Sequence, residues 1–286
     1  MFSFIIPCFN QTPLLKKVLS SFISQKSSNI DFEVLLIDNN SDSGVIEEAY
    51  YKYFDKIPLY LLKQPKLDST YALAKARNLG LNLAQYPWVI TLDSDCLLCP
   101  DYIQKLKEAV SSVGHDNAIF TGERCFIQQN LVSEDMVVSS HSEIESLPKI
   151  GSPSNYGLAK DRRLPAMDKL PNIPHPWSYF LGCNTVFQKD KALSIGGFDE
   201  RFDGYWGYED IDFAFRYITK FDSRACYSSD IKVYHCDPEI TTSTVDSASR
   251  FNKSENPNWE RICNIIPGFK EFKEQQYRRL SSEIVL

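Results

Sequence analysis

The sequence predicts an α/β protein with a mostly parallel central sheet and helices on both faces. Short apolar runs alternate with helix-like periods through the first half of the 286 residues, which is the pattern of repeated βα units. Ligands of such sheets bind beyond the carboxyl ends of the strands. In this sequence those ends carry a group of polar side chains, namely Asn10, Asp38, Asn39, Asp93 and Asp95.

The first half is expected to alternate strand and helix in order. The expected strands are Phe2–Phe9, Phe32–Asp38, Pro58–Gln64, Trp88–Asp95 and Ala118–Glu123. After the first strand, Thr12 is expected to cap a helix that has Pro13 at its first position. The second strand ends in "NNSDSG", a turn-rich stretch. Further helices are expected over about residues 69–85 and after Pro100.

The second half begins with an irregular excursion over residues 125–177, which is rich in proline and has few apolar periods. A stretch of this kind in a compact domain is usually a functional loop or a mobile segment. Regular structure is expected to return with a strand, a short helix and a glycine turn in "YFLGCNTVFQKDKALSIGGFDE". A helix from Glu209 follows, and then one or two strands in "ACYSSDIKVYH". The chain after Asp237 has no interpretable pattern.

Composition excludes several classes of protein. A net charge of −6 and a pI near 5.4 argue against a nucleic-acid surface, which is normally basic. The longest apolar runs are far shorter than the roughly 20 residues that span a bilayer, and the N-terminus lacks the features of a signal peptide. Eight cysteines are scattered without a disulfide framework, which predicts reduced thiols and a cytoplasmic location.

Two aspartates in "TLDSDCLLCP" are candidate metal ligands. Asp93 and Asp95 lie two residues apart after an apolar strand, so in an extended chain their side chains point to the same side. Two carboxylates this close repel each other unless a cation or a proton lies between them, and a hard divalent cation such as Mg²⁺ suits them. The alternative is an aspartate-rich turn. The position at the end of a buried strand favours the metal.

A second pair of acids opens the segment "WGYEDIDFAFR". Glu209 and Asp210 begin a helix, where the helix dipole favours acids by about 0.3–1 kcal/mol, and this is the purely structural explanation. It does not account for the aromatic residues Tyr205 and Trp206 nearby, which offer apolar faces against which a ligand can pack. Gly207 lets the backbone approach a substrate closely. The acids are therefore candidate reagents.

Taken together in order, five stretches carry a family resemblance. They are "IIPCFNQ", "LLIDNNSDSG", "AKARNLGL", "LDSD" and "GGFDERFDGYWGYEDIDFAFR". The chain resembles a GT-A-fold glycosyltransferase of the family 2 type over roughly residues 2–236. Its last stretch is similar to the signature of galactosyltransferases, N-acetylgalactosaminyltransferases and bacterial chondroitin-type polymerases. The resemblance implies a donor-binding half over residues 1–123, an acceptor-binding and catalytic half of the same domain over 124–240, and a C-terminal extension over 241–286.

The resemblance also implies roles on the donor side. The residues implied to border the nucleotide and its sugar are Pro7, Phe9, Asn10, Asp38, Asn39, Arg77, Asp93 and Ser94. Asp38 and its neighbour would contact the base, usually uracil, although Asn39 stands where many relatives have a second acid. Asp95 would ligate a divalent metal and Asp93 would hold the ribose or a metal-bound water. His235 matches a further metal ligand, and because imidazole suits Mn²⁺ better than Mg²⁺, manganese is expected and magnesium is the alternative.

On the acceptor side, the resemblance implies that one acid takes the proton from the attacking hydroxyl. Asp210 is assigned as this base and Glu209 as an acceptor ligand, with the reverse assignment left open. Tyr205, Trp206 and Gly207 complete the expected acceptor site.

The expected activity is an inverting, metal-dependent transfer from a nucleotide-sugar, with a UDP-linked hexose or N-acetylhexosamine favoured. The expected acceptor is a saccharide or glycolipid, which leaves room for peripheral contact with the inner membrane face. Alternatives are a retaining transferase of the same fold, a sugar-1-phosphate nucleotidyltransferase, and a non-catalytic carbohydrate-binding relative. "PCFNQTPLLKK" lacks the Gly-rich basic signature expected of the nucleotidyltransferase.

Overall fold

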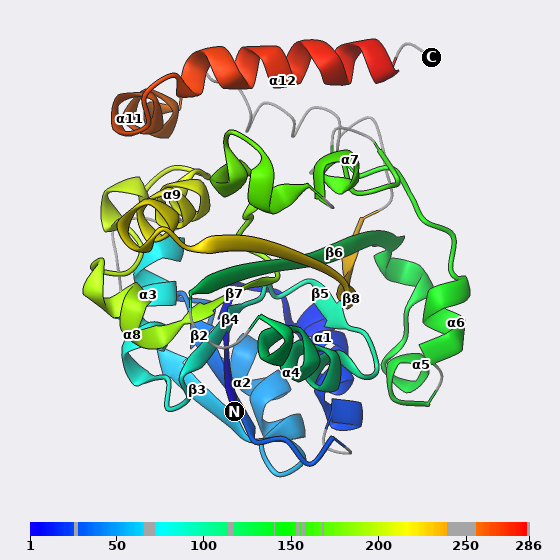
Figure 1. The fold of residues 1–286 in the computed structure, drawn as a ribbon. Helices are drawn as coiled ribbons and strands as arrows, with labels where there is room; N and C mark the ends of the chain where they lie inside the picture. Colours follow the sequence, from blue (N-terminus) through cyan, green and yellow to red (C-terminus); the bar gives the residue numbers. More distant parts are fainter. Residues whose placement is uncertain are drawn as a thin grey trace.

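A single eight-stranded sheet organises the computed structural model (Figure 1), which describes residues 1–25, 28–65, 72–113, 117–139, 141–152, 155, 158–167, 169–238 and 256–284. The strand order is β3-β2-β1-β4-β7-β6-β8-β5. The strands are β1 (Phe2–Cys8), β2 (Phe32–Asp38), β3 (Leu59–Lys63), β4 (Trp88–Thr91), β5 (Cys96–Leu98), β6 (Ala118–Gln128), β7 (Thr185–Gln188) and β8 (Arg224–Asp237).

The first four strands form the parallel part that the apolar runs predict. β1 pairs in parallel with both β2 and β4, and β2 pairs in parallel with β3. The carboxyl ends of β1 and β2 therefore lie side by side, with Cys8 opposite Asp38. This register confirms the α/β class and brings the polar residues that follow these strands to one edge.

The expected strand Trp88–Asp95 is too long. β4 ends at Thr91, and the N–H of Cys96 donates to the carbonyl oxygen of Asp93 at 3.1 Å, which closes a tight turn. The chain then continues as β5, which pairs antiparallel with β8. Asp93 and Asp95 consequently lie in a turn between two strands, and the argument from an extended chain does not hold for them.

The remaining strands make the sheet mixed. β7 runs antiparallel to β4 and β6, whereas β6 and β8 are parallel over most of their length, with an irregularity between Gly122 and Arg124. β6 continues through the predicted division at residue 123 as far as Gln128, so the two predicted halves share one sheet. The fold is the expected GT-A architecture with a mostly parallel sheet.

Helices cover both faces of the sheet, as expected. They are α1 (Thr12–Gln25), α2 (Val45–Tyr53), α3 (Leu73–Leu83), α4 (Tyr102–Ser112), α8 (Lys189–Ser194) and α9 (Glu209–Phe221). Side chains of α1, α2 and α4 belong to the core on one face, and those of α3, α8 and α9 to the core on the other. α3 is shorter than expected, and residues 69–71 of that prediction lie outside the described residues.

Two expectations about the first helices are corrected by the structure. The hydroxyl of Thr12 donates to the carbonyl oxygen of Val45, so it ties α1 to α2 instead of capping its own helix. α2 itself was not expected from the sequence. It follows the turn-rich "NNSDSG" and is short, but Ile46, Ala49 and Tyr53 are buried at helical spacing.

The excursion over residues 125–177 is irregular yet held by charged side chains. Its short helices are α5 (Glu134–Ser139), α6 (His141–Ser146) and α7 (Leu164–Met167), with 3-10 turns η2 (Gln129–Leu131), η4 (Leu170–Asn172) and η5 (Pro176–Tyr179). The buried Arg163 pairs with Asp161 at 2.6 Å and donates to Thr121 Oγ1 of β6 at 2.8 Å. This guanidinium with several fixed acceptors adds to the apolar packing of the segment, in which Ile144 and Leu170 are buried.

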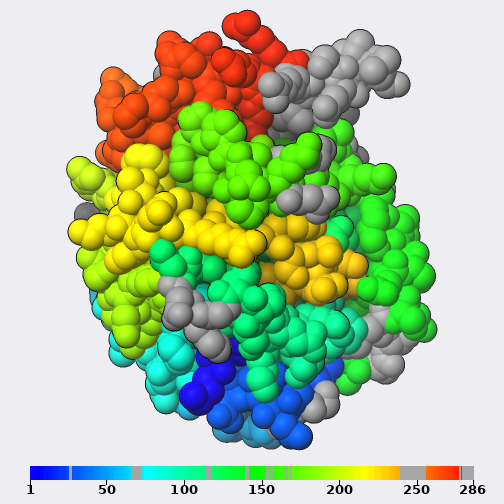
Figure 2. All heavy atoms as spheres, viewed as in Figure 1, coloured from blue at the N-terminus to red at the C-terminus, as the bar shows by residue number. Residues whose placement is uncertain are grey.

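Two helices lie in the C-terminal region, where the sequence shows no strong pattern. They are α11 (Pro257–Ile265) and α12 (Phe269–Ile284), while residues 239–255 lie outside the described part of the chain. Figure 2 shows this pair, in orange and red, seated on green and yellow parts of the chain. Phe269 and Phe272 of α12 contact Trp177 of η5, with ring centroids 5.8 and 5.7 Å apart. None of the described helices has the length and apolarity needed to span a bilayer.

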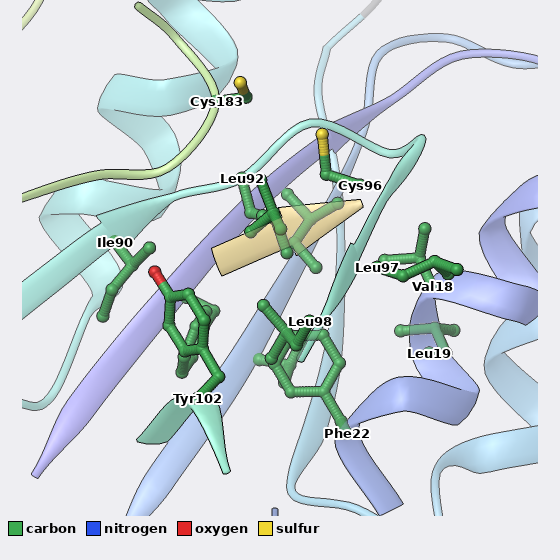
Figure 3. Close-up of a cluster of buried hydrophobic side chains, with 14 of the residues drawn as sticks. Val18, Leu19, Phe22, Ile90, Leu92, Cys96, Leu97, Leu98, Tyr102 and Cys183 are labelled. Atoms are coloured by element: carbon green, nitrogen blue, oxygen red, sulfur yellow. The ribbon is translucent and has the colours of Figure 1, made fainter. Parts of the chain in front are cut away.

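A dense core fixes the turn that carries Asp93 and Asp95. Figure 3 shows Phe22 of α1 among the side chains of β4 and β5, next to Leu98 and Tyr102. Leu92 and Cys96, which flank the turn, are completely buried. Since close-packed interiors resist displacement, the turn between these two residues is held from below by the core. No disulfide joins the eight cysteines, all of which lie among the described residues.

Candidate active site

The loops after β1 and β2 are tied together by side-chain hydrogen bonds. The N–H of Ser41 donates to Asp38 Oδ1 at 2.9 Å, and the N–H of Asp42 donates to Asn10 Oδ1 at 2.8 Å. Asp38 and Asn39 are both buried at this edge. The backbone of Asn10 is left-handed, with φ of 50°, a conformation that asparagine tolerates better than most residues. The predicted base-binding residues therefore form one ordered patch.

Three further residues of the predicted donor side lie nearby in the chain. Pro7 lies within β1, opposite Ile37 of β2. Phe9 follows β1 and is 39% exposed, which leaves an apolar surface open beside the polar patch. The hydroxyl of Ser94 lies 3.1 Å from Gln11 Oε1, so the turn after β4 contacts the loop after β1.

Asp95 and His235 come together as the metal prediction requires. β5 pairs with β8 so that Cys96 lies opposite His235, and Asp95 Oδ1 is 3.6 Å from His235 Nε2. His235 Nδ1 is 3.3 Å from Asp237 Oδ1 on its other side. Burial lowers the pKa of His235, but the carboxylates of Asp95 and Asp237 more than offset this and raise it to about 10.

The donor set suits a divalent cation. Ligand atoms of Asp95, Cys96 and His235 all lie within 4.8 Å of one another. Two ligands at about 2.1 Å from one ion lie roughly 3–4 Å apart, so the 3.6 Å between Asp95 and His235 needs little adjustment. Asp237 was not singled out in the sequence, although it lies two residues beyond His235 on the same strand. Its carboxylate lies 3.3 Å from the second ring nitrogen, the position that outer partners of metal-binding histidines commonly take.

Arg77 connects the two acid pairs. Its side chain is only 2% exposed, its Nη1 lies 2.6 Å from Glu209 Oε1, and its Nη2 lies 3.6 Å from Asp93 Oδ1. Although burial alone lowers the pKa of Arg77, the acids Glu209, Asp93 and Asp210 raise it above its usual value. One buried cation thus places the turn after β4 and the start of α9 in the same site.

Glu209 and Asp210 have different surroundings. The Glu209 side chain is buried and engaged by Arg77, which does not match the acceptor-binding role expected for it. Asp210 accepts hydrogen bonds from the N–H groups of Gly182 and Ile211, both at 2.8 Å. Burial and the neighbouring Glu209 raise the pKa of Asp210 to about 6, with Arg77 opposing them. Of the two acids, Asp210 is the one with the environment of a general base.

Gly182 and Asp203 support this arrangement and have no clear sequence signal. A Cβ atom on Gly182 would lie 2.2 Å from Arg77 Nη2, so the absence of a side chain at this position leaves room for the guanidinium. Asp203 accepts hydrogen bonds from the N–H groups of Ala74 and Lys75 at 2.9 and 3.0 Å. It therefore caps α3, the helix that carries Arg77, from a distant part of the chain.

The expected acceptor residues lie on an irregular loop before α9. Tyr205 is 53% exposed, and Trp206 and Gly207 are partly buried. Gly207 and Tyr208 both have left-handed backbones, with φ of 85° and 77°. Two such residues in succession turn the chain sharply into α9, so the aromatic loop and Asp210 are adjacent.

One edge of this α/β fold therefore combines the polar residues after β1 and β2, the Asp95–His235 pair and the two acids that open α9. Residues 3–166 match the model described as glycosyl transferase family 2, which is more than half of the chain, and residues 162–234 match the model described as N-terminal domain of galactosyltransferase. The chain belongs to glycosyl transferase family 2.

Curated relatives agree with this assignment, and solved structures share the fold. A chondroitin synthase of Pasteurella multocida is 29% identical over 76% of this chain, and one of Escherichia coli is 27% identical over 96%. The chain spans 23% and 39% of the lengths of these two relatives. Staphylococcus aureus TarS with UDP-GlcNAc superposes with a TM-score of 0.59 at 17% identity, covering 85% of this chain and 60% of that one. A Pyrobaculum calidifontis mannosyltransferase with GDP-Man and Mn²⁺ gives 0.55 at 18% identity, covering 88% of this chain and 61% of that one.

Proposed function

We propose that the chain transfers a sugar from a nucleotide-sugar to an acceptor hydroxyl with inversion, assisted by a divalent cation. One observation carries this proposal. Arg77 contacts Asp93, two residues before Asp95, and Glu209, which adjoins Asp210. The turn that carries the metal-competent Asp95 and the helix start that carries the candidate base are therefore held in one site. Structural relatives contain UDP-GlcNAc or GDP-Man with Mn²⁺, and the synthase relatives make chondroitin. We therefore favour a UDP-linked hexose or N-acetylhexosamine as donor, a saccharide or glycolipid as acceptor, and Mn²⁺ as the metal.

On the donor side, the patch around Asp38 and Asn39 would receive the base, with Phe9 as its open apolar surface. Asp95 and His235 would hold the cation and Asp93 would contact the ribose or a metal-bound water. When bound, the cation supplies positive charge that neutralises the charge developing on the nucleoside diphosphate as it leaves.

On the acceptor side, Asp210 would take the proton from the attacking hydroxyl. Two backbone N–H groups fix both of its carboxylate oxygens, so little reorganisation is needed at the moment of attack. A pKa near 6 leaves the group ionised at neutral pH while it is more basic than an ordinary aspartate. A positioned base of this kind contributes about 10²–10⁴-fold in rate. Glu209 would orient Arg77 instead of binding the acceptor.

The test is a panel of UDP-glucose, UDP-galactose, UDP-GlcNAc, UDP-GalNAc, UDP-glucuronate and GDP-mannose with Mn²⁺ and saccharide acceptors. We expect one UDP-sugar to be consumed. Asp95→Ala should weaken donor binding, whereas Asp210→Asn should keep donor binding and lose transfer. Asp190→Asn, an exposed aspartate on α8, is the matched control. Normal transfer by both site variants would show that the roles are assigned wrongly.

The stereochemistry is tested separately. The same fold serves retaining transferases, and the NMR coupling of the anomeric proton in the product distinguishes the two outcomes. Inversion is expected because Asp210 is placed as a base. A product with the donor's anomeric configuration would favour the retaining alternative. A non-catalytic carbohydrate-binding relative would bind saccharide without consuming any of the donors.

A further inference from the structure

We propose that Asn258, in the first turn of α11, is a positioning residue that sets the shape of the acceptor loop and so controls acceptor binding. The acceptor loop is defined here as residues 202–208. This inference rests on the proposed function. It concerns a part of the chain beyond residue 234, where the match to the galactosyltransferase domain ends.

The side chain of Asn258 is fully buried and faces the backbone of the acceptor loop. Its Nδ2 donates to the carbonyl oxygens of Phe202 at 2.7 Å, Gly207 at 3.1 Å and Tyr205 at 3.2 Å. An amide nitrogen has only two hydrogens, so at least one of them is shared between two carbonyls. The Asn258 amide nitrogen therefore holds three carbonyl groups of the acceptor loop around a single atom.

The orientation of this amide is fixed by Arg261. Arg261 Nη1 donates to Asn258 Oδ1 at 2.6 Å, and a guanidinium has no acceptor, so the oxygen of the amide must face it. The NH₂ group is then directed at the loop. The Arg261 guanidinium also lies over the Phe202 ring, 5.4 Å from its centroid, which ties the same residue to the start of the loop.

Asn256 adds a second contact of the same kind. Its Oδ1 accepts from the N–H of Asn258 at 2.9 Å, which caps α11, while its Nδ2 donates to the carbonyl oxygen of Trp206 at 2.8 Å. With Asn258, this accounts for the carbonyls of Phe202, Tyr205, Trp206 and Gly207. The N-terminal end of α11 thus serves as the hydrogen-bonding partner of the acceptor loop.

The acceptor loop needs such a partner because its own backbone forms little regular structure. Gly204, Gly207 and Tyr208 are all left-handed, with φ of 99°, 85° and 77°. Carbonyl groups that are removed from water without a donor destabilise the folded chain, so a loop of this shape needs donors from elsewhere. Ring contacts of Tyr208 with Trp259 and Phe269, at 5.8 and 6.0 Å, complete the junction with α11 and α12.

The consequence is specific to one side of the site. The acceptor loop presents Tyr205 and Trp206 and leads directly into Asp210. The donor residues lie on β1, β2, the turn after β4 and α3, and Asp203, whose carboxylate caps α3, is not among the residues whose carbonyls Asn258 binds. Loss of the Asn258 amide should therefore change how a saccharide acceptor binds while leaving the donor edge as it is.

The decisive variant is Asn258→Asp. Aspartate keeps the size of the side chain and the bond from Arg261, but it has no N–H and turns an oxygen toward the loop carbonyls. With p-nitrophenyl β-glucuronide and p-nitrophenyl β-N-acetylgalactosaminide as acceptors, we expect the acceptor KM to rise roughly 10- to 100-fold, because each lost hydrogen bond is worth about fivefold. The KM for the UDP-sugar should stay within about twofold. Asn256→Ser, which keeps the helix cap, should raise the acceptor KM less.

Amide hydrogen exchange followed by mass spectrometry supplies a readout that does not depend on activity. Exchange in residues 202–208 should speed up in Asn258→Asp, while exchange in β1 stays unchanged. Asn82→Asp is the control, since Asn82 is an exposed asparagine whose amide donates only to the Asn78 carbonyl at 2.9 Å.

Each outcome is informative. Unchanged exchange in the acceptor loop would overturn the inference that Asn258 holds this loop. Faster exchange with an unchanged acceptor KM would overturn the role of Asn258 in acceptor binding. A rise in donor KM equal to the rise in acceptor KM would show a general loss of structure. A wild-type protein that transfers no sugar would instead overturn the proposed function, and hydrogen exchange would still decide whether Asn258 holds the loop.

Discussion

Replacing Arg77 by methionine should destabilise the protein strongly, because the change leaves a buried acid without its partner. Arg77 and Glu209 are 2% and 7% exposed, and their charged atoms are 2.6 Å apart. Removing one member of a buried pair of this kind costs about 3–5 kcal/mol. Asp93 is 37% exposed, so water replaces its contact with Arg77 and adds little to this figure. For a chain of this size, Tm falls by about 2 °C for each kcal/mol of unfolding free energy that is lost, so we expect a fall in Tm of roughly 6–10 °C.

The assay is thermal unfolding followed by intrinsic fluorescence. The double variant Arg77→Met with Glu209→Met should recover most of the loss, since replacing both members by apolar residues is often neutral. Arg201→Met is the control: it removes a pair of similar length, 2.6 Å to Asp199, from an arginine that is 73% exposed. Its Tm should be nearly unchanged. The reasoning is refuted if Arg77→Met falls no further than this control, or if the double variant is less stable than the single one.

Two further predictions concern the same network. Gly182→Ala should lower kcat at least about tenfold with normal expression. The added Cβ would lie 2.2 Å from Arg77 Nη2 and push the guanidinium away from Asp93 and Glu209. Wild-type rates in steady-state kinetics would contradict this steric argument. The pH profile of kcat/KM should fall as the pH drops through about 6, since burial raises the pKa of Asp210 in the free protein to that value and only the ionised form accepts a proton. A profile that stays flat down to pH 5 would mean that another group is the base.

Much of the parallel half of the fold could be predicted from the sequence. β1 and β2 are buried along their whole length, and strands buried on both faces appear in sequence as continuous apolar runs. β5 could not be predicted as a separate strand, because it has only three residues after the turn at Asp93–Asp95 and its pairing with β8 is what makes it a strand. α12 was missed because its surface is largely polar and few apolar positions mark its buried side.

The candidate site likewise contains residues that the sequence marks by their chemistry and residues that only the fold brings into place. Asp95 and His235 have side chains whose chemistry is visible in the sequence, and the structure brings them within 3.6 Å. Asn258 donates to backbone carbonyls of a distant segment, and Gly182 donates its own N–H to the distant Asp210. Nothing in the immediate sequence of either residue marks this contact. Glu209 was assigned to the acceptor because it adjoins Asp210, and only the structure shows that it is buried against Arg77.

The most direct test of the account is calorimetric titration of the chain with UDP in the presence and absence of Mn²⁺. A cation held between Asp95 and His235 would contact the nucleoside diphosphate, so we expect UDP binding with Mn²⁺ that is lost in EDTA and in Asp95→Ala. Binding of UDP with equal affinity in EDTA, or in Asp95→Ala with Mn²⁺, would contradict it.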